Sequence, residues 1–250
     1  MIQCDFLMDS ILKLQEKWFD TNANRLKLLM DFFKAENIKY ELKPFDSIFG
    51  TGKNILVPIN NKANNNILIT AHYDDDGIYD NFGGVVQLIS LIQNQEAFTN
   101  YNIDFLFTDQ EERFQQGIYQ YLKMVKGSVS YDVHLNIDGI GIGKSLICYK
   151  SNGHFVVDWL CNNSKSILLT DNTPLINSGI PSYHIFSCLE EDSEIIIKNQ
   201  KLSESLCVYF DESWCKLYFN NENISYYTPF IENFLKSGFN TKDKRFVQLS

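Results

Sequence analysis

The residues best suited to chemistry lie in one stretch, ILITAHYDDDGIYDNFGG, over residues 67–84. An apolar run that is typical of a buried parallel strand leads to His72 and Asp74, and Asp80 follows in the next loop. Histidine and carboxylates at the carboxyl end of such a strand lie where open α/β sheets bind ligands. Neighbouring acids repel one another unless solvent or a cation screens them. The stretch therefore indicates either a solvated acidic turn or a metal site.

Two further apolar runs that are typical of core strands also end in carboxylates. IDFLFTDQEE ends at Glu111 and Glu112, and VHLNIDG carries Asp138. If neighbouring strands bring these groups to one sheet edge, their charges oppose one another's ionisation unless a cation is present. Histidine with carboxylates, without clustered cysteines, suits Zn²⁺ or a similar divalent ion. We therefore interpret His72, Asp80 and the carboxylates of the other two strands as a candidate metal site.

The elements that must position these residues alternate between strand-like and helical patterns. This alternation predicts an α/β fold: a mixed, mostly parallel twisted sheet that is flanked by helices. An amphipathic helix is expected over residues 153–165. Two strand-like patches, SLCVYF and WCKLYF, predict a β-hairpin that is inserted near the C-terminus, between residues 189 and 223. Because no linker or internal repeat is found, we expect a single domain over residues 1–250.

The same motifs resemble the co-catalytic zinc aminopeptidase family, a group of zinc exopeptidases that includes bacterial leucyl aminopeptidases, glutamate carboxypeptidases and glutaminyl cyclases. The family pattern AHxD is matched by AHYD, and its Asp-Asn pair with glycine is matched by DNFGG. Its Glu-Glu strand end is matched by FLFTDQEE, its LNxD strand end by LNID, and its GIP turn by residues 179–181. These motifs run in the family's order from Asn54 to about Ser187, which is a specific signal although each motif alone is weak.

The resemblance implies a role for each matched residue. It assigns four zinc ligands: His72, Asp80, Glu112 and Asp138. Among them, His72 and Asp138 would hold one ion and Glu112 a second, with Asp80 bridging the two. Asp74 would orient His72 and fix the position of its ring proton. Glu111 would be the general base that takes a proton from the attacking water.

One family position holds a different residue. The family completes its second metal site with a histidine in a Tyr-His-Thr segment, and Tyr227 stands there in SYYTPFIENF. A neutral phenol is a poor zinc ligand, so one or two zinc ions are expected. His184, just after the GIP turn, could supply the missing nitrogen or line the substrate pocket. His134, on the strand that leads to Asp138, is expected to be satisfied by a neighbour in the core.

Three functions are compatible with these motifs. The first is a zinc-dependent aminopeptidase, a metallopeptidase that hydrolyses the N-terminal peptide bond of a peptide with a metal-activated water. The second is a single-zinc acyl transferase that resembles glutaminyl cyclase. The third is a catalytically impaired peptidase-like protein that only binds peptides. Retention of Glu111 favours an enzyme, because a binding protein has no need of a base there.

Composition limits the partners and the location. The chain has 250 residues, a hydrophobic content of 44% and a net charge of −9, which suit a folded domain and disfavour nucleic acid or anionic membrane as partners. No apolar run reaches the length of a membrane span. The first 19 residues contain Asp5 and lack the cationic start of a signal peptide, and the six cysteines show no CxxC spacing. We therefore expect a cytoplasmic protein without structural disulfides, while the oligomeric state is left open.

Overall fold

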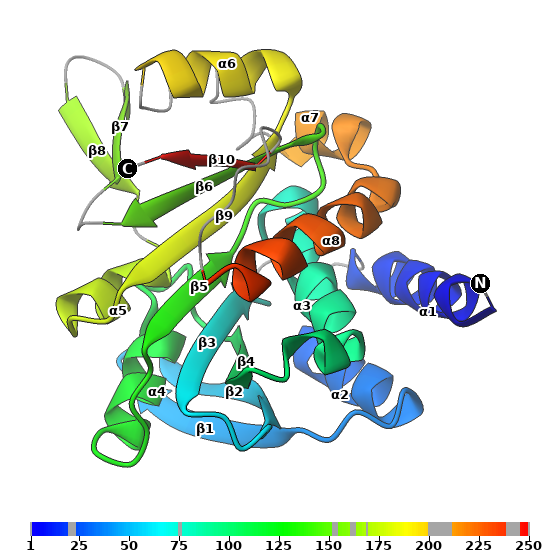
Figure 1. Ribbon diagram of the computed structural model, residues 1–250, viewed down its shortest axis with the longest axis vertical. Coiled ribbons are helices and arrows are strands. Elements are labelled where there is room, and N and C mark those ends of the chain that lie inside the picture. The colour runs from blue at the N-terminus through cyan, green and yellow to red at the C-terminus, as the bar shows by residue number, and fades with distance from the viewer. Residues whose placement is uncertain are drawn as a thin grey trace.

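The computed structural model describes these residues: 2–19, 24–74, 77–151, 155–160, 164–168, 170–199, 212–238 and 246–249. Their centre is a twisted eight-stranded sheet in the order β1-β2-β4-β3-β5-β9-β6-β10, with helices on both faces (Figure 1). Its strands are β1 (Glu41–Ser47), β2 (Gly50–Ile59), β3 (Asn65–His72), β4 (Tyr101–Thr108), β5 (Val133–Ile137), β6 (Ser145–Ser151), β9 (Ser182–Cys188) and β10 (Phe246–Leu249). A separate two-stranded ribbon pairs β7 (Phe155–Leu160) with β8 (Ser164–Leu168).

The helices connect and cover these strands. They are α1 (Ile2–Trp18), α2 (Arg25–Ala35), α3 (Gly83–Gln93), α4 (Gln116–Val125), α5 (Asn172–Asn177), α6 (Glu190–Asn199), α7 (Glu212–Tyr218) and α8 (Asn221–Lys236). A π-helical turn, η1 (Ile78–Phe82), leads directly into α3, and a 3₁₀ turn, η2 (Gln95–Phe98), follows it. None of the described helices is both long enough and apolar enough to cross a membrane.

The four central strands β4, β3, β5 and β9 run parallel. In this register His72 lies opposite Thr108, and Thr70 lies opposite Asn136. The carboxyl ends of β3, β4 and β5 therefore meet at one edge of the sheet, as the sequence predicts. The outer strands β2 and β6 join this parallel block in antiparallel fashion, which makes the sheet mixed.

Both faces of the sheet are buried, which explains the nearly continuous apolar runs in the sequence. On one face, Leu68 and Leu106 pack with Ile118 and Tyr121 of α4. On the other face, β3 contributes residues such as Ile69 to a larger core that it shares with α1, α2, α3 and α8 (Figure 1). Alternate residues of each strand thus serve different cores, as a pleated strand requires.

The predicted fold class is confirmed, but the inserted β-hairpin is wrong where the structure describes it. WCKLYF lies within α7 and the residue that follows it, and residues 190–199 form α6. In α7, Cys215 is buried, and Phe219, directly after the helix, forms an isolated antiparallel bridge with Ile142. Phe219 contacts Phe82 at a ring-centroid distance of 6.3 Å. This tertiary packing overrides the strand preference of the aromatic residues; SLCVYF lies outside the described residues.

The helix expected over residues 153–165 is also wrong. Residues 155–160 and 164–168 form the antiparallel strands β7 and β8. The β-branched pair Val156 and Val157 favours an extended backbone, and this preference prevails over the apparent helical spacing. Of the cysteines, Cys148, Cys188 and Cys215 are free thiols that lie buried in the described part of the chain.

Candidate metal centre

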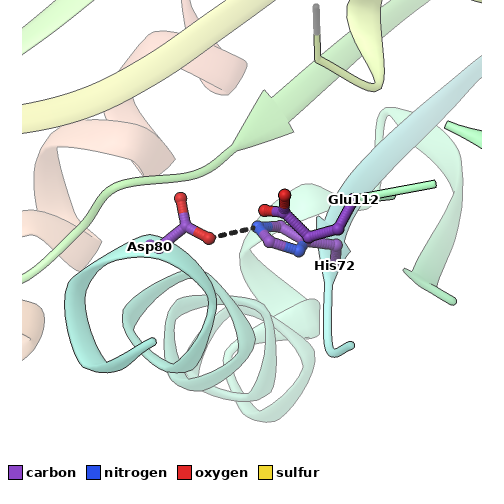
Figure 2. A group of neighbouring side chains, drawn as sticks. All are labelled: His72, Asp80 and Glu112. Carbon is purple, nitrogen blue, oxygen red and sulfur yellow. Dashed lines mark ion pairs between the residues drawn. The ribbon is translucent and has the colours of Figure 1, made fainter. Parts of the chain in front are cut away.

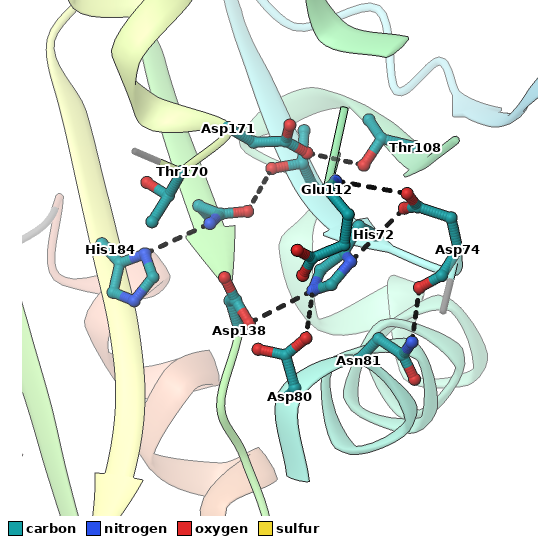
Figure 3. A network of polar contacts seen from close by, with 12 residues as sticks. His72, Asp74, Asp80, Asn81, Thr108, Glu112, Asp138, Thr170, Asp171 and His184 are labelled. Atoms are coloured by element: carbon teal, nitrogen blue, oxygen red, sulfur yellow. Dashed lines mark hydrogen bonds and ion pairs between the residues drawn. The ribbon is translucent and has the colours of Figure 1, made fainter. Parts of the chain in front are cut away.

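His72 is the centre of the group of chemical residues. It ends β3, and its side chain is only 2% exposed. Its Nε2 atom lies 3.4 Å from Asp80 Oδ2 and 3.4 Å from Asp138 Oδ1, and its Nδ1 atom lies 3.4 Å from Asp74 Oδ1 (Figure 3). Neither ring nitrogen makes a hydrogen bond of ordinary length. Buried polar atoms usually have hydrogen-bond partners, so a buried imidazole without an ordinary hydrogen bond at either nitrogen requires an explanation.

The separations around His72 fit a bound zinc ion. Zinc binds nitrogen and oxygen at roughly 2.0–2.2 Å, so neighbouring ligand atoms of a tetrahedral site lie about 3.3–3.5 Å apart. His72, Asp80 and Glu112 each offer a ligand atom within 4.8 Å of the others, and the three side chains point toward one another (Figure 2). A cation there would satisfy the imidazole and neutralise the carboxylates together. The residues present therefore fit the metal that the motifs suggest.

Backbone contacts bring Asp80 and Asp138 together. The amide of Gly139 donates to the carbonyl of Asp80 (3.1 Å), and the amide of Ile140 donates to the carbonyl of Tyr79 (3.0 Å). The loop after β5 is thereby fastened to η1. Helix α3 packs on this loop so closely that a Cβ atom at Gly83 would lie 1.8 Å from the carbonyl oxygen of Ile140. Glycine is required at this position because no other residue fits.

A chain of hydrogen bonds supports Asp74 from the N-terminal helix. The indole of Trp18 donates to Asn81 Oδ1 (3.2 Å), and Asn81 Nδ2 donates to the backbone carbonyl of Asp74 (2.5 Å). The carboxylate of Asp74 faces His72 Nδ1 and also accepts from the amide of Glu112 (3.2 Å). Asp74 thus connects the candidate ligands His72 and Glu112 to the buried Trp18. This connection is not visible in the spacing of the sequence motifs.

The pKa values of His72 and Glu111 are both raised, for different physical reasons. Burial opposes protonation of His72, but the nearby carboxylates of Asp80 and Asp138 outweigh it and raise the pKa of His72. Burial also raises the pKa of Glu111 well above its usual value, and the negative charges of Asp171 and Asp138 add to this effect. A carboxylate with a raised pKa is a stronger base, which suits the role that the motif implies for Glu111.

Asp171 is a neighbour of the site that sequence reasoning missed. It is 1% exposed, and the hydroxyl of Thr108 donates to its Oδ2 atom (2.6 Å) while its Oδ1 atom has no hydrogen bond. Burial raises the pKa of Asp171 to about 7, and Asp74 and Asp138 contribute in the same direction. In the sequence this aspartate stands just before α5, where it resembles an ordinary helix N-cap.

His184 is buried on β9 but does not join the His72 group. Its Nδ1 atom lies 3.1 Å from Asn136 Nδ2, and Thr70 donates to Asn136 Oδ1 at 2.7 Å (Figure 3). The network continues from Thr70 to His134, whose other ring nitrogen lies 2.6 Å from the hydroxyl of Ser182. The prediction that His134 is satisfied in the core is confirmed.

Tyr227 has a structural role in the protein core. It is fully buried on α8, and its hydroxyl donates to the backbone carbonyls of Ile142 (3.1 Å) and Gly143 (2.5 Å). The phenol therefore anchors the loop that leads from Asp138 to β6. The chain uses this position for a structural hydrogen bond.

Comparison with known proteins agrees with this geometry. A sequence profile of Peptidase family M28 matches residues 54–214, which include every candidate ligand. The chain belongs to this family. No curated protein sequence matches the chain.

Solved structures share the fold. The LapA aminopeptidase of Legionella pneumophila superposes with a TM-score of 0.63 at 13% identity, over 96% of this chain and 71% of that one. The glutaminyl cyclase of Tannerella forsythia superposes with a TM-score of 0.63 at 14% identity, over 94% and 98%. A Zn-dependent exopeptidase from Parabacteroides distasonis gives 0.60 at 15% identity, over 95% and 96%. Membership of this peptidase family supports a metallopeptidase-type hydrolase that acts on peptides.

Proposed function

We propose that this M28 family member is a zinc-dependent aminopeptidase that removes the N-terminal residue of a peptide. The observation that carries the proposal is the buried imidazole of His72, whose Nε2 atom makes no hydrogen bond of ordinary length and faces carboxylate oxygens of Asp80 and Asp138 at 3.4 Å. No arrangement of protons within the group supplies hydrogen bonds of ordinary length at these separations. A divalent cation accounts for the separations, the burial and the concentration of negative charge together.

The proposal assigns one zinc ion to His72, Asp80 and Asp138, which would leave the fourth position open for water. Glu112 lies beside this site. When bound, zinc polarises the scissile carbonyl and lowers the pKa of water to roughly 7. Asp74 holds His72 in place through Nδ1, as an outer carboxylate commonly does for a metal-binding histidine. Among the described residues, no second histidine joins the group, and this supports one ion rather than two.

Glu111 is the proposed general base. It is 7% exposed and lies beside the candidate ligand Glu112 at the end of β4. Glu111 accepts the proton of the attacking water and returns it to the leaving amine when the peptide bond breaks. Burial raises its pKa, which strengthens it as a base for this proton transfer. The uncoordinated oxygens of the carboxylate group also attract the N-terminal ammonium of a peptide.

The experiment that tests the function combines a substrate panel with metal removal. The protein, stripped of metal and then given one equivalent of zinc, is incubated with peptides that differ in the N-terminal residue, including glutamine, and with the same peptides acetylated. The proposal expects zinc-dependent release of the N-terminal amino acid and no cleavage of acetylated peptides. Cyclisation of the glutamine peptide with release of ammonia, without hydrolysis, would show a glutaminyl cyclase-like transferase instead of an aminopeptidase. Zinc-independent binding of the peptides without turnover would show a peptide-binding protein instead of an enzyme.

A further inference from the structure

Two exposed phenylalanines stack on each other next to the loop that carries the candidate base. Phe49 lies in the turn between β1 and β2, and Phe114 lies in the loop after β4. Their ring centroids are 5.9 Å apart with an interplanar angle of 24°. Phe49 is 37% exposed and Phe114 is 63% exposed. Exposed large apolar side chains that are gathered in one place are typical of binding surfaces. We call this pair the aromatic rim.

The aromatic rim is fastened to the catalytic loop. Arg113 Nη1 donates to the carbonyl of Phe49 (3.2 Å), and the hydroxyl of Ser47 donates to Gln110 Oε1 (2.6 Å). The loop that makes these contacts also carries Glu111 and Glu112. Phe114 follows Glu112 by two residues, so their Cα atoms lie at most about 7.6 Å apart. A molecule that binds at the candidate ligands is therefore close to the rim.

The backbone of Phe114 is held in an unfavourable conformation. Its φ angle is +61°, and the adjacent Gln115 has a φ angle of +52°. Bulky residues rarely adopt this left-handed region, whereas glycine adopts it readily. A glycine at this position would remove the strain but also the ring. Because strained conformations cluster at ligand sites, a phenylalanine in this conformation points to binding.

We propose that the aromatic rim binds an apolar side chain of the peptide substrate, in the part that follows the scissile bond. This inference rests on the proposed function. His72 and Glu111 are buried, so the N-terminal residue occupies the inner part of the site near the carboxylates. The remainder of the peptide extends toward solvent, and only this part can reach two rings that are themselves exposed. The preferred substrates are therefore peptides with a large apolar residue after the first.

Binding to a Glu111→Gln background tests the rim without turnover. Titration calorimetry measures the affinity of the zinc-loaded protein for Ala-Phe-Ala and Ala-Ser-Ala, with and without Phe49→Ser or Phe114→Ser. We expect about tenfold tighter binding of Ala-Phe-Ala, and near-equal binding of the two peptides after either rim substitution. The matched control is Met124→Ser, which removes another exposed apolar side chain on α4 (47% exposed) and should keep the preference.

Phe114→Gly separates binding from folding. Because glycine relieves the positive φ angle, this variant should melt at the same or a higher temperature and still lose the preference for Ala-Phe-Ala. If Glu111→Gln with an intact rim binds both peptides equally, while the wild type shows zinc-dependent aminopeptidase turnover, the proposed role of the rim is wrong. The proposed function would still stand. Absence of peptide binding and of turnover would overturn the proposed function and the rim with it.

Discussion

Asn136 donates its side-chain amide to Nδ1 of His184, at a distance of 3.1 Å. The hydroxyl of Thr70 occupies the amide oxygen of Asn136, which leaves the nitrogen to face His184. Burial lowers the pKa of His184 to about 4, so the ring is neutral at pH 7 and carries its proton on Nε2. A ring whose Nδ1 accepts a hydrogen bond and whose Nε2 is protonated has no lone pair for a metal.

His184 should therefore be dispensable for zinc binding. We expect His184→Gln to change the zinc affinity by less than about threefold, whereas His72→Gln should lower it by at least about 100-fold, because it removes the only nitrogen donor of the proposed site. Competition with a chromophoric chelator measures both affinities. Equal losses in the two variants would show that His184 is a ligand.

The hydrogen bond from Trp18 should influence the metal from a distance. Trp18→Phe preserves the aromatic contact with Phe82, whose ring centroid lies 5.4 Å away, but removes the N–H donor to Asn81. Loss of a buried hydrogen-bond partner costs about 1–3 kcal/mol of unfolding free energy. Because Asn81 holds Asp74, we also expect zinc affinity to fall by about 3- to 10-fold. An unchanged zinc affinity in this variant would show that the contact serves the fold alone.

Tyr227→Phe provides the matched comparison. It removes a buried hydroxyl that serves the carbonyls of Ile142 and Gly143, so urea unfolding should report a loss of about 1–3 kcal/mol. Zinc affinity should stay the same, because the phenol is not a ligand in the proposed site. A clear loss of zinc in this variant would contradict the structural role given to Tyr227.

His134 and His184, two of the three buried histidines in the described part of the chain, should make the zinc-free protein sensitive to acid. Burial lowers the pKa of His134 to about 3 and that of His184 to about 4, whereas an unfolded histidine titrates near 6.5. Below that value the unfolded state binds protons that the folded state does not, so stability is present above about pH 6.5 and decreases toward pH 4. His184 alone contributes about 3 kcal/mol of this loss. Urea unfolding at pH 7 and pH 4.5 should show a smaller decrease for His184→Gln, and identical decreases in both proteins would refute the assignment.

The ends of three strands could be predicted from sequence because local patterns determine them. The apolar runs before Asp74, Glu111 and Asp138 predict β3, β4 and β5, and parallel strands place their carboxyl ends at the same edge. The position of His72 among carboxylates follows from this arrangement. The resemblance to zinc exopeptidases adds the individual roles that are proposed for these residues.

The features that sequence did not reveal depend on contacts between distant segments. Trp18 and Asn81 are 63 residues apart, and Thr108 and Asp171 are also 63 residues apart. No spacing rule connects such pairs, and Asp171 resembles an ordinary helix cap in the sequence. The same holds for α7: its aromatic residues favour a strand locally, whereas Phe219, directly after the helix, packs against Phe82 of η1.

A comparison of the wild-type protein with Glu111→Gln tests whether zinc and Glu111 act together in hydrolysis. Wild-type protein and Glu111→Gln are loaded with zinc, their zinc content is measured, and their rates of release of N-terminal amino acids are compared. We expect one zinc ion per chain in both proteins and a decrease in kcat of about 10²–10⁴-fold in the variant. Zinc-loaded Glu111→Gln with undiminished turnover, or wild-type protein that binds no zinc, would contradict this expectation.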